Sequence, residues 1–302
     1  MQPATTMLAM AASLACATIA SPLPLAARTV TEGQADNETM KTREDDHWRM
    51  TIPVNVEGKG PFEFLLDTGS QRTIVSTTLA QLLVLPPGPS VRIVGLAGAG
   101  DAGTAKVSSL DIGQRTVHSL IVPLLDREDI GADGIVGTDS LQDQRIVFDF
   151  AENTVHMGDA RELGGNAGYE IVVRARQESG RLIMTNGRLD GIRVRIVIDT
   201  GSSTTVGNRA LQRALSEQQE NFVKLYSATG HTLDAPFHIG RRLTVNNLVV
   251  GGTFVAFADS PAFAELDLEK KPALFLGMRE LREFKRIAID FAQSTVLFDV
   301  PD

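Results

Sequence analysis

The segment Phe62-Glu63-Phe64-Leu65-Leu66-Asp67-Thr68-Gly69-Ser70 ends an apolar run with a turn, and the tetrapeptide Asp-Thr-Gly-Ser returns at Asp199–Ser202 after the run Ile192–Ile198. Runs rich in β-branched and aromatic residues predict strands, and glycine permits a tight turn after each. At average residue usage, two chance copies of this tetrapeptide in one chain have a probability on the order of 10⁻⁵. The pattern therefore predicts two strand-to-turn units whose aspartates meet in one active site.

Two further blocks repeat downstream of the tetrapeptides. Gly134–Gly137 is matched by Ala273–Gly277, and Arg145–Ala151 is matched by Arg286–Ala292 almost letter for letter. In chain order, the three pairs of copies are offset by 132, 140 and 141 residues. A period of this length indicates a duplicated domain rather than a solenoid.

The duplication and the changes in composition predict five regions. Residues 1–27 are a signal peptide, 28–46 a polar leader or flexible segment, 47–160 the N-terminal lobe, 161–168 a linker and 169–302 the C-terminal lobe. The linker prediction comes from its glycine-rich sequence. The leader has few large apolar side chains, so we expect it to be mobile or to act as a propeptide.

The first 27 residues carry no charged side chain and contain an apolar stretch that ends in small residues, which is typical of a secretory signal. We therefore expect a periplasmic or secreted protein. A lipoprotein anchor at Cys16 is a less favoured alternative, because Ser13 stands where a large aliphatic residue is usual. Cleavage would remove the only cysteine, and no later segment approaches the roughly 18 apolar residues of a membrane span.

The net charge of −8 argues against a surface that binds phosphates, so nucleic acid is not an expected partner. The five histidines show no spacing with cysteines or carboxylates that would mark a zinc site. We expect neither a metal nor another cofactor.

The paired aspartates suggest acid–base chemistry. Hydrolysis of a peptide bond without a metal or a covalent nucleophile needs a base to activate water and an acid to protonate the leaving group. Two adjacent carboxyls provide both, because they cannot both ionise readily and so share one proton. Asp67 and Asp199 are the candidate catalytic pair.

The other residues of each tetrapeptide have plausible supporting roles. Gly69 and Gly201 allow close approach of the two loops, and their amides can bond the carboxylates. We expect the hydroxyls of Thr68 and Thr200 to bond across a pseudo-twofold axis, with capping of the local turn as the alternative. For the two serines at the ends of the tetrapeptides, Ser70 and Ser202, the alternatives are a bond to the outer carboxylate oxygen and capping of the local turn.

These motifs resemble the clan AA aspartic proteases, specifically bacterial retropepsin-like proteins with two lobes in one chain, over about residues 47 to 302. The resemblance implies an all-β fold of two similar acid-protease lobes, related by a pseudo-twofold axis with the cleft between them. It also implies ψ-shaped loops that thread beneath the catalytic loops, formed by Ile135, Val136, Gly137, Phe275, Leu276 and Gly277. Each should be buried and followed by a short helix, Thr138 to Gln142 and Met278 to Phe284.

Glycine-rich hairpins in both lobes resemble retropepsin flaps more than the single tyrosine-bearing flap of pepsins. The first would place strands at Val91 to Leu96 and Thr104 to Leu110 around a tip at 97–103, and the second would have its tip at 228–231. The flap candidates are Ala97, Gly98, Ala99, Gly100, Ala228, Thr229 and Gly230. Tyr226 is a candidate substitute for the flap aromatic. Ordinary surface hairpins remain the alternative, since glycine turns are common.

The leading interpretation is an aspartic endopeptidase that acts as a monomer on a peptide or protein substrate, with the two lobes pairing within one chain. The alternative is a catalytically silent peptide-binding or scaffold protein on the same fold. Two intact copies of the tetrapeptide favour the enzyme.

Overall fold

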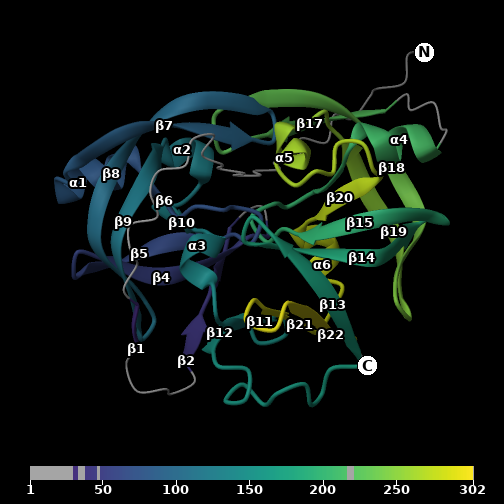
Figure 1. Cartoon of the computed structure of the whole chain (residues 1–302), viewed down its shortest axis with the longest axis horizontal. Coiled ribbons are helices and arrows are strands. Elements are labelled where there is room, and N and C mark those ends of the chain that lie inside the picture. The colour runs from purple at the N-terminus through teal and green to yellow at the C-terminus, as the bar shows by residue number, and fades with distance from the viewer. Residues whose placement is uncertain (1–29, 33–37, 46–47, 216–220, 302) are drawn as a thin grey trace, which may run out of the picture.

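The structure is a computed structural model, and it describes residues 30–32, 38–45, 48–215 and 221–301. The predicted signal peptide, and Cys16 with it, lies outside the described residues. Most of the described residues form β-strands, which make two lobes side by side (Figure 1). The prediction of an all-β fold with two similar lobes is confirmed.

The sheet of the N-terminal lobe contains nine strands of the described residues. These are β1 (Val30–Glu32), β3 (Arg43–Glu44), β4 (Met50–Val56), β5 (Lys59–Leu66), β6 (Ile74–Ser76), β7 (Pro87–Gly95), β8 (Gly98–Ile112), β9 (Arg115–Leu125) and β10 (Gly134–Val136). Three short helices accompany them: α1 (Thr77–Leu83), α2 (Arg127–Ile130) and α3 (Thr138–Leu141).

The second sheet contains thirteen strands of the described residues and continues from the C-terminal lobe into the base of the molecule. Its C-terminal-lobe strands are β13 (Ile171–Glu178), β14 (Arg181–Leu189), β15 (Ile192–Ile198), β16 (Thr205–Gly207), β17 (Phe222–Tyr226), β18 (Thr232–Val245), β19 (Leu248–Phe257), β20 (Ala273–Leu276), β21 (Arg286–Asp290) and β22 (Thr295–Asp299). Three strands come from the N-terminal half: β2 (Glu38–Lys41), β11 (Arg145–Asp149) and β12 (Thr154–Gly158). The helices of this lobe are α4 (Arg209–Leu215), α5 (Pro261–Ala264) and α6 (Met278–Leu281).

The two lobes are joined where a strand pairs with its own repeat. β11 and β21 are the repeated Arg-Ile blocks, and they run antiparallel with Val147 opposite Ala288 at the centre of the pairing. These two residues are also equivalent in the repeat, since both lie two positions after the arginine that opens the block. The pairing therefore places a pseudo-twofold axis between them, beneath the lobes (Figure 1).

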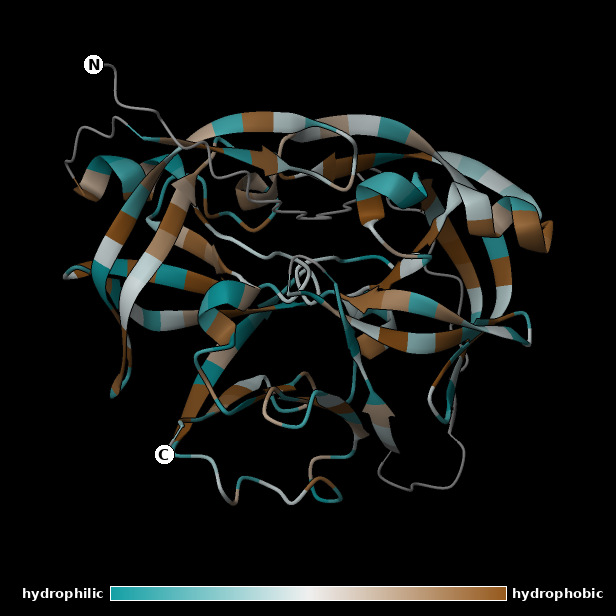
Figure 2. Cartoon of the chain, turned by 180° about the vertical axis from the view of Figure 1, so that it is seen from behind, coloured by the Kyte–Doolittle hydropathy of each residue, from teal (hydrophilic) through white to brown (hydrophobic). Residues whose placement is uncertain are grey.

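The core forms because alternate side chains of each strand point to the same face of the sheet. In β4, for example, the side chains of Ile52, Val54 and Val56 are buried on one face. The largest cluster of buried apolar side chains continues from these residues through Phe148 at the base to Ile196 in the other lobe. Figure 2 shows the same arrangement, with apolar segments along the strands of both lobes. Packing across the lobes therefore supports the relative position of the two repeats.

Some local predictions need correction. Part of the segment 28–46, expected to be a mobile leader, forms strands: β1 pairs with β9, β2 with β12 and β3 with β4. The two helices after the ψ-loops are shorter than predicted and end at Leu141 and Leu281. The predicted tip of the first hairpin at 97–103 is wrong, because Gly98 already pairs with Gly95 and the following residues continue strand β8.

Candidate active site

The two aspartates lie at the centre of the molecule, each directly after a buried strand. Asp67 follows β5 and Asp199 follows β15, and these strands pair in parallel with the ψ-loop strands β10 and β20. The amide of Asp67 donates to the carbonyl of Val136 at 3.1 Å, and that of Asp199 donates to Leu276 at 3.0 Å. The ψ-loops thus hold both catalytic-loop backbones from beneath, as the resemblance implies.

Both ψ-loops end in a glycine that lies against backbone. A Cβ on Gly277 would lie 2.7 Å from the carbonyl carbon of Thr204, and one on Gly137 would overlap the backbone of Arg72. No side chain fits at either position without a backbone shift. The remaining ψ-loop candidates Ile135, Val136, Phe275 and Leu276 are all buried. These contacts explain why each block ends in glycine.

The loops bring the two carboxyl groups next to each other. A Cβ added to Gly69 would lie 2.6 Å from the carboxyl carbon of Asp199, and one added to Gly201 would overlap the carboxyl of Asp67. Each glycine therefore lets its own loop approach the opposite aspartate. Both aspartates are buried.

Two threonines tie the loops together across the pseudo-twofold axis. The hydroxyl of Thr68 donates to the carbonyl of Ile198 at 2.9 Å, and that of Thr200 donates to the carbonyl of Leu66 at 2.6 Å. Each hydroxyl also accepts the backbone N–H of the other threonine, at 3.1 and 3.3 Å. These are the bonds expected from the sequence, and all four groups are buried.

Backbone amides, rather than serine hydroxyls, hold the carboxylates. Oδ1 of Asp67 accepts from the amides of Gly69 at 2.8 Å and Ser70 at 3.0 Å, and Oδ1 of Asp199 accepts from Gly201 at 3.1 Å. The hydroxyls of Ser70 and Ser202 instead donate to carbonyls two residues later in their own turns. Of the two alternatives for the serines, the structure therefore has local turn capping.

Burial shifts the ionisation of the pair. It raises the pKa of Asp67 to about 6, against the backbone hydrogen bonds from Gly69 and Ser70, which lower it. Burial and then the charge of Asp67 raise the pKa of Asp199 well above its ordinary value. Two carboxyls in these surroundings ionise one after the other, so that one proton is shared over a range of pH.

The two hairpins meet over the aspartate pair, and the tip of each one packs against the opposite lobe. β7 and β8 form the first hairpin and β17 and β18 the second, and their ends meet at the top of Figure 1. Leu96 at the first tip is buried in an apolar cluster of the C-terminal lobe that includes Phe275. Ala228 at the second tip is buried in a cluster of the N-terminal lobe that includes Ile135. Each tip is therefore anchored in the opposite lobe.

The other flap candidates lie at or beside these tips. Ala97 is at the first turn, Gly98, Ala99 and Gly100 begin strand β8, and Thr229 and Gly230 are in the second turn. A Cβ on Gly95 would lie 2.8 Å from the hydroxyl oxygen of Ser227, so the two hairpins touch. Tyr226 is partly exposed at the end of β17.

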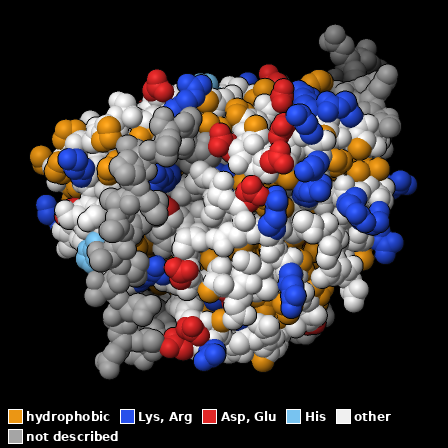
Figure 3. All heavy atoms as spheres, in the orientation of Figure 1, with side chains coloured by type: hydrophobic (Ala, Val, Ile, Leu, Met, Phe, Trp, Pro, Cys, Tyr) orange, Lys and Arg blue, Asp and Glu red, His pale blue; other side chains and the backbone are white. Residues whose placement is uncertain are grey.

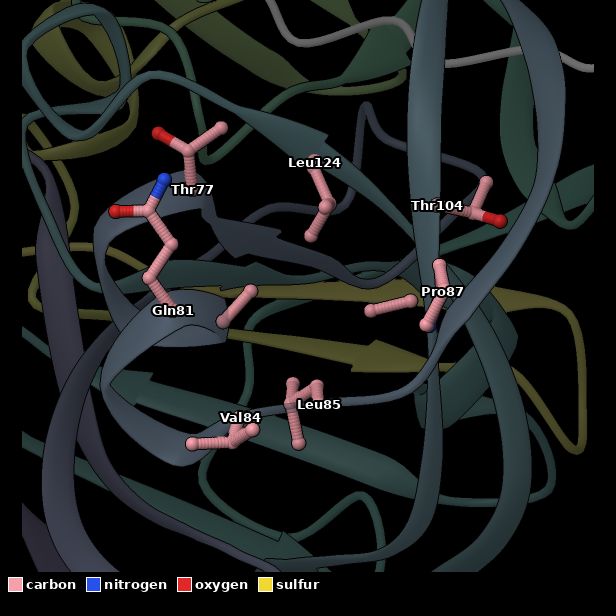
Figure 4. Close-up of a pocket in the computed structure, with 9 residues that line it drawn as sticks. Thr77, Gln81, Val84, Leu85, Pro87, Thr104 and Leu124 are labelled. Atoms are coloured by element: carbon pink, nitrogen blue, oxygen red, sulfur yellow. The ribbon is translucent and has the colours of Figure 1, made fainter.

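One well-defined pocket lies away from the aspartates (Figure 4). It lies between α1, the β7–β8 hairpin and β9, and its lining includes Gln81, Leu85 and Leu124. No predicted site residue borders it. This pocket is a shallow depression with a mostly apolar lining.

Figure 3 shows acidic and basic side chains interspersed on the face toward the viewer. Within the described ranges, no group of three or more histidine, cysteine or acidic residues could hold a metal ion. No helix in the described part of the chain is long and apolar enough to cross a membrane.

Two buried charged residues near the site escaped the sequence analysis. Glu280 follows the second ψ-loop, accepts hydrogen bonds from the hydroxyl of Thr205 and the amide of Phe254, and has its pKa raised by burial to about 7. Arg181 is fully buried on β14, and its charge lowers the pKa of both aspartates. A signal existed for the arginine, because Arg181 and Arg49 each stand 18 residues before the aspartate of their lobe.

Comparison with known proteins agrees with this geometry. No curated protein matches the chain. A family model described as aspartyl protease matches residues 52–140 and 185–279, together more than half of the chain. Each matched region contains one of the two candidate catalytic aspartates and one ψ-loop glycine. With one matched region in each lobe, the chain belongs to the aspartyl protease family.

Proposed function

We propose that this protein is an aspartic endopeptidase in which Asp67 and Asp199 activate a water molecule that attacks the peptide carbonyl. The observation that carries the proposal is that two buried carboxyl groups lie close together, each against the glycine of the opposite loop. The ionised carboxyl takes a proton from the water, and the protonated one polarises the substrate carbonyl. The proton then passes to the departing amine.

The surroundings of the pair suit this role. The amides of Gly69, Ser70 and Gly201 fix one oxygen of each carboxyl, and the threonine bonds keep the loops from separating. Fixed geometry lowers the barrier because the reacting groups do not have to be ordered during the reaction. In the proposal, the substrate lies between the catalytic loops and the two hairpin tips, which exclude solvent when closed.

The experiment is incubation of the mature chain with a diverse peptide mixture from about pH 3 to 7, followed by mass spectrometry of the products. Asp67→Asn and Asp199→Asn should each lower the rate by about 10³-fold or more, because each removes half of the acid–base pair. Asp267→Asn is the matched control, since this carboxylate is exposed and pairs only with the nearby Lys271. A statine inhibitor should block the parent enzyme.

The outcomes separate the two functions considered from the sequence. Cleavage that survives in either dyad variant would sink the shared mechanism. Peptide binding by the parent without cleavage at any pH would instead support the catalytically silent binding protein.

We also propose that the activity is periplasmic or extracellular, on the basis of the signal-like sequence of residues 1–27. Fractionation of cells that express the full chain tests this. Recovery of the chain only in the cytosol, with residue 1 retained, would contradict it.

A further inference from the structure

Arg181 is a buried cation whose hydrogen-bond donors are unused. Its side chain is fully buried, and Nε, Nη1 and Nη2 have no hydrogen-bond partner. An isolated charge in a protein interior is destabilising by several kcal/mol unless it is paired, and buried donors are nearly always satisfied. An arginine in this state therefore needs a partner that the described residues do not supply.

The strand register places Arg181 beside the catalytic pair. β14 and β15 pair with Ile183 opposite Val197, so the same register continued by two residues puts Arg181 opposite Asp199. Residues directly opposite in an antiparallel pair point to the same face, as do residues two apart on one strand. Ile183 and Val197 on that face contact the cluster that receives Leu96 of the first flap tip. Arg181 therefore lies on the face that carries this cluster, close to the catalytic loop.

The equivalent arginine of the first lobe shows what is missing. In that lobe Thr51 lies opposite Leu65, so Arg49 has the same relation to Asp67. Arg49 is engaged by Asp45, with Nε and Nη2 each 2.6 Å from Oδ2, and Nη2 also donates to the carbonyl of Ile130 at 3.0 Å. Among the described residues, therefore, only the arginine of the first lobe has a hydrogen-bonded carboxylate, although the charge of Arg181 acts on the two nearby aspartates.

A carboxylate is close to Arg181 in sequence but is used elsewhere. Glu178 lies opposite Arg181 in the β13–β14 hairpin, yet its carboxylate pairs with Arg176 at 2.7 Å. That pair is largely exposed. The turn between Glu178 and Arg181 is bonded to the first lobe, because the side-chain amide of Gln142 donates to the carbonyl of Gly180 at 3.3 Å. Nothing in these contacts reaches the guanidinium.

We propose that Arg181 binds a carboxylate of the substrate, so that the enzyme prefers an acidic side chain on one side of the scissile bond. This inference rests on the peptidase activity proposed above. The planar guanidinium matches a carboxylate with two parallel hydrogen bonds, and three free nitrogens leave both edges available. The preference is confined to one side of the scissile bond, because the equivalent Arg49 of the first lobe is already paired with Asp45.

The test uses peptides that the enzyme cleaves, each made in matched forms with Glu or Gln at one position from three before to three after the cut bond. At one position the parent should cleave the Glu form about 10- to 100-fold faster in kcat/KM, as expected for a buried hydrogen bond to a charged group. Arg181→Gln should bring this ratio close to one. Arg181→Lys, which keeps the charge but not the fork, should give an intermediate ratio.

Arg176→Gln is the matched control, because it removes the same charge from the same hairpin at an exposed position. It should keep the full Glu preference. Circular dichroism and thermal unfolding of all variants check that they fold. A parent enzyme that cleaves Glu and Gln forms equally at every position overturns the inference without any variant.

A purely electrostatic role of Arg181 on the dyad gives a different result. In that case Arg181→Gln would slow the cleavage of all peptides equally and shift the acidic limb of the pH profile to higher pH. The ratio of kcat/KM for the Glu and Gln forms would not change. This result would overturn the inference. Binding of the same peptide pairs to Asp67→Asn, measured by fluorescence anisotropy, separates the two proposals. Tighter binding of the Glu form that is lost in Asp67→Asn/Arg181→Gln supports recognition even if no peptide is ever cleaved.

Discussion

In the strands that join the lobes, Arg145 of the first repeat bonds Asp290 of the second, whereas the equivalent Arg286 bonds Asp299 within its own lobe. Around the aspartates, by contrast, the threonine bonds run in both directions with matching partners. The duplication has thus kept its symmetry where backbone groups meet at the axis. Side-chain charges a short distance away are arranged differently in the two copies.

The difference has a physical basis. A hydroxyl that donates to a buried carbonyl of the opposite lobe leaves that carbonyl unsatisfied when it is lost. A charged side chain can instead find another partner as neighbouring residues change, as the pairs of Arg145 and Arg286 show. Arg49 and Arg181 differ in the same way next to the active site. Arg49 is paired with Asp45, whereas Arg181 has no hydrogen-bond partner among the described residues.

The largest expected difference between the copies concerns the arginines at the base. Arg145→Met should lower the free energy of unfolding by about 3–5 kcal/mol, because it leaves the buried carboxylate of Asp290 without its partner. Arg286→Met should lower it by only about 1 kcal/mol, since its pair with Asp299 is partly exposed. Urea unfolding measures both. Equal losses would show that the two pairs are energetically equivalent after all.

Both catalytic-loop glycines should be sensitive to substitution. Gly69→Ala and Gly201→Ala each place a methyl group against the opposite carboxyl and should reduce kcat/KM by about 100-fold through misplacement of the dyad. We expect the larger loss for Gly201, where the overlap is greater. Gly103→Ala is the control, because nothing lies within 4 Å of its Cβ position. Full activity in either catalytic-loop variant would contradict the contact.

The threonine bonds should contribute equally from both sides. Thr68→Val and Thr200→Val each remove one donor to a carbonyl of the opposite lobe, and each should lower the free energy of unfolding by about 1–3 kcal/mol. The double variant should lose less than the sum, because the two residues share one network. A loss confined to one threonine would break the symmetry inferred at the axis.

The pH dependence tests the difference between the two aspartates. The active form has one proton on the pair, so protonation of the base, with a pKa of about 6 for Asp67, removes activity as the pH falls. Below that value, kcat/KM should fall about tenfold per pH unit. Burial and the charge of ionised Asp67 raise the pKa of Asp199, so the second carboxyl keeps its proton when Asp67 ionises. A maximum of kcat/KM near pH 3 would show that the pair is more acidic than its burial implies.

Much of this site is readable from the sequence because its features are local. The repeated tetrapeptide predicts the strand ends, the close approach of Gly69 and Gly201 and the direction of the threonine bonds. The start of the helix Thr77–Leu83 is local as well, since Ser76 caps it by accepting from the amide of Leu79. Each of these depends on residues within a few positions of one another or on the symmetry of the duplication.

What the sequence did not reveal depends on pairing across the chain. Glycine and alanine in 98–103 indicate a turn, yet cross-strand hydrogen bonds with β7 hold these residues in β8. The polar segment around Glu38–Lys41 lacks apolar alternation, but its backbone pairs with the edge of β12. The sequence also does not show that Arg181 lacks a hydrogen-bond partner among the described residues, because this depends on the pairing of Glu178 with Arg176.

The exchanged flap tips make opening of the site a property of both lobes at once. Removing Leu96 from its cluster exposes a buried side chain, which is unfavourable by about 1.5–3 kcal/mol. Opening at that tip alone would then be populated at roughly one to ten per cent, and the apparent affinity for substrate falls by the same fraction. Peptides able to occupy the space left by the tips would recover part of that difference. If the chain is the peptidase proposed above, access to the aspartate pair then depends on the length of the peptide as well as on its sequence.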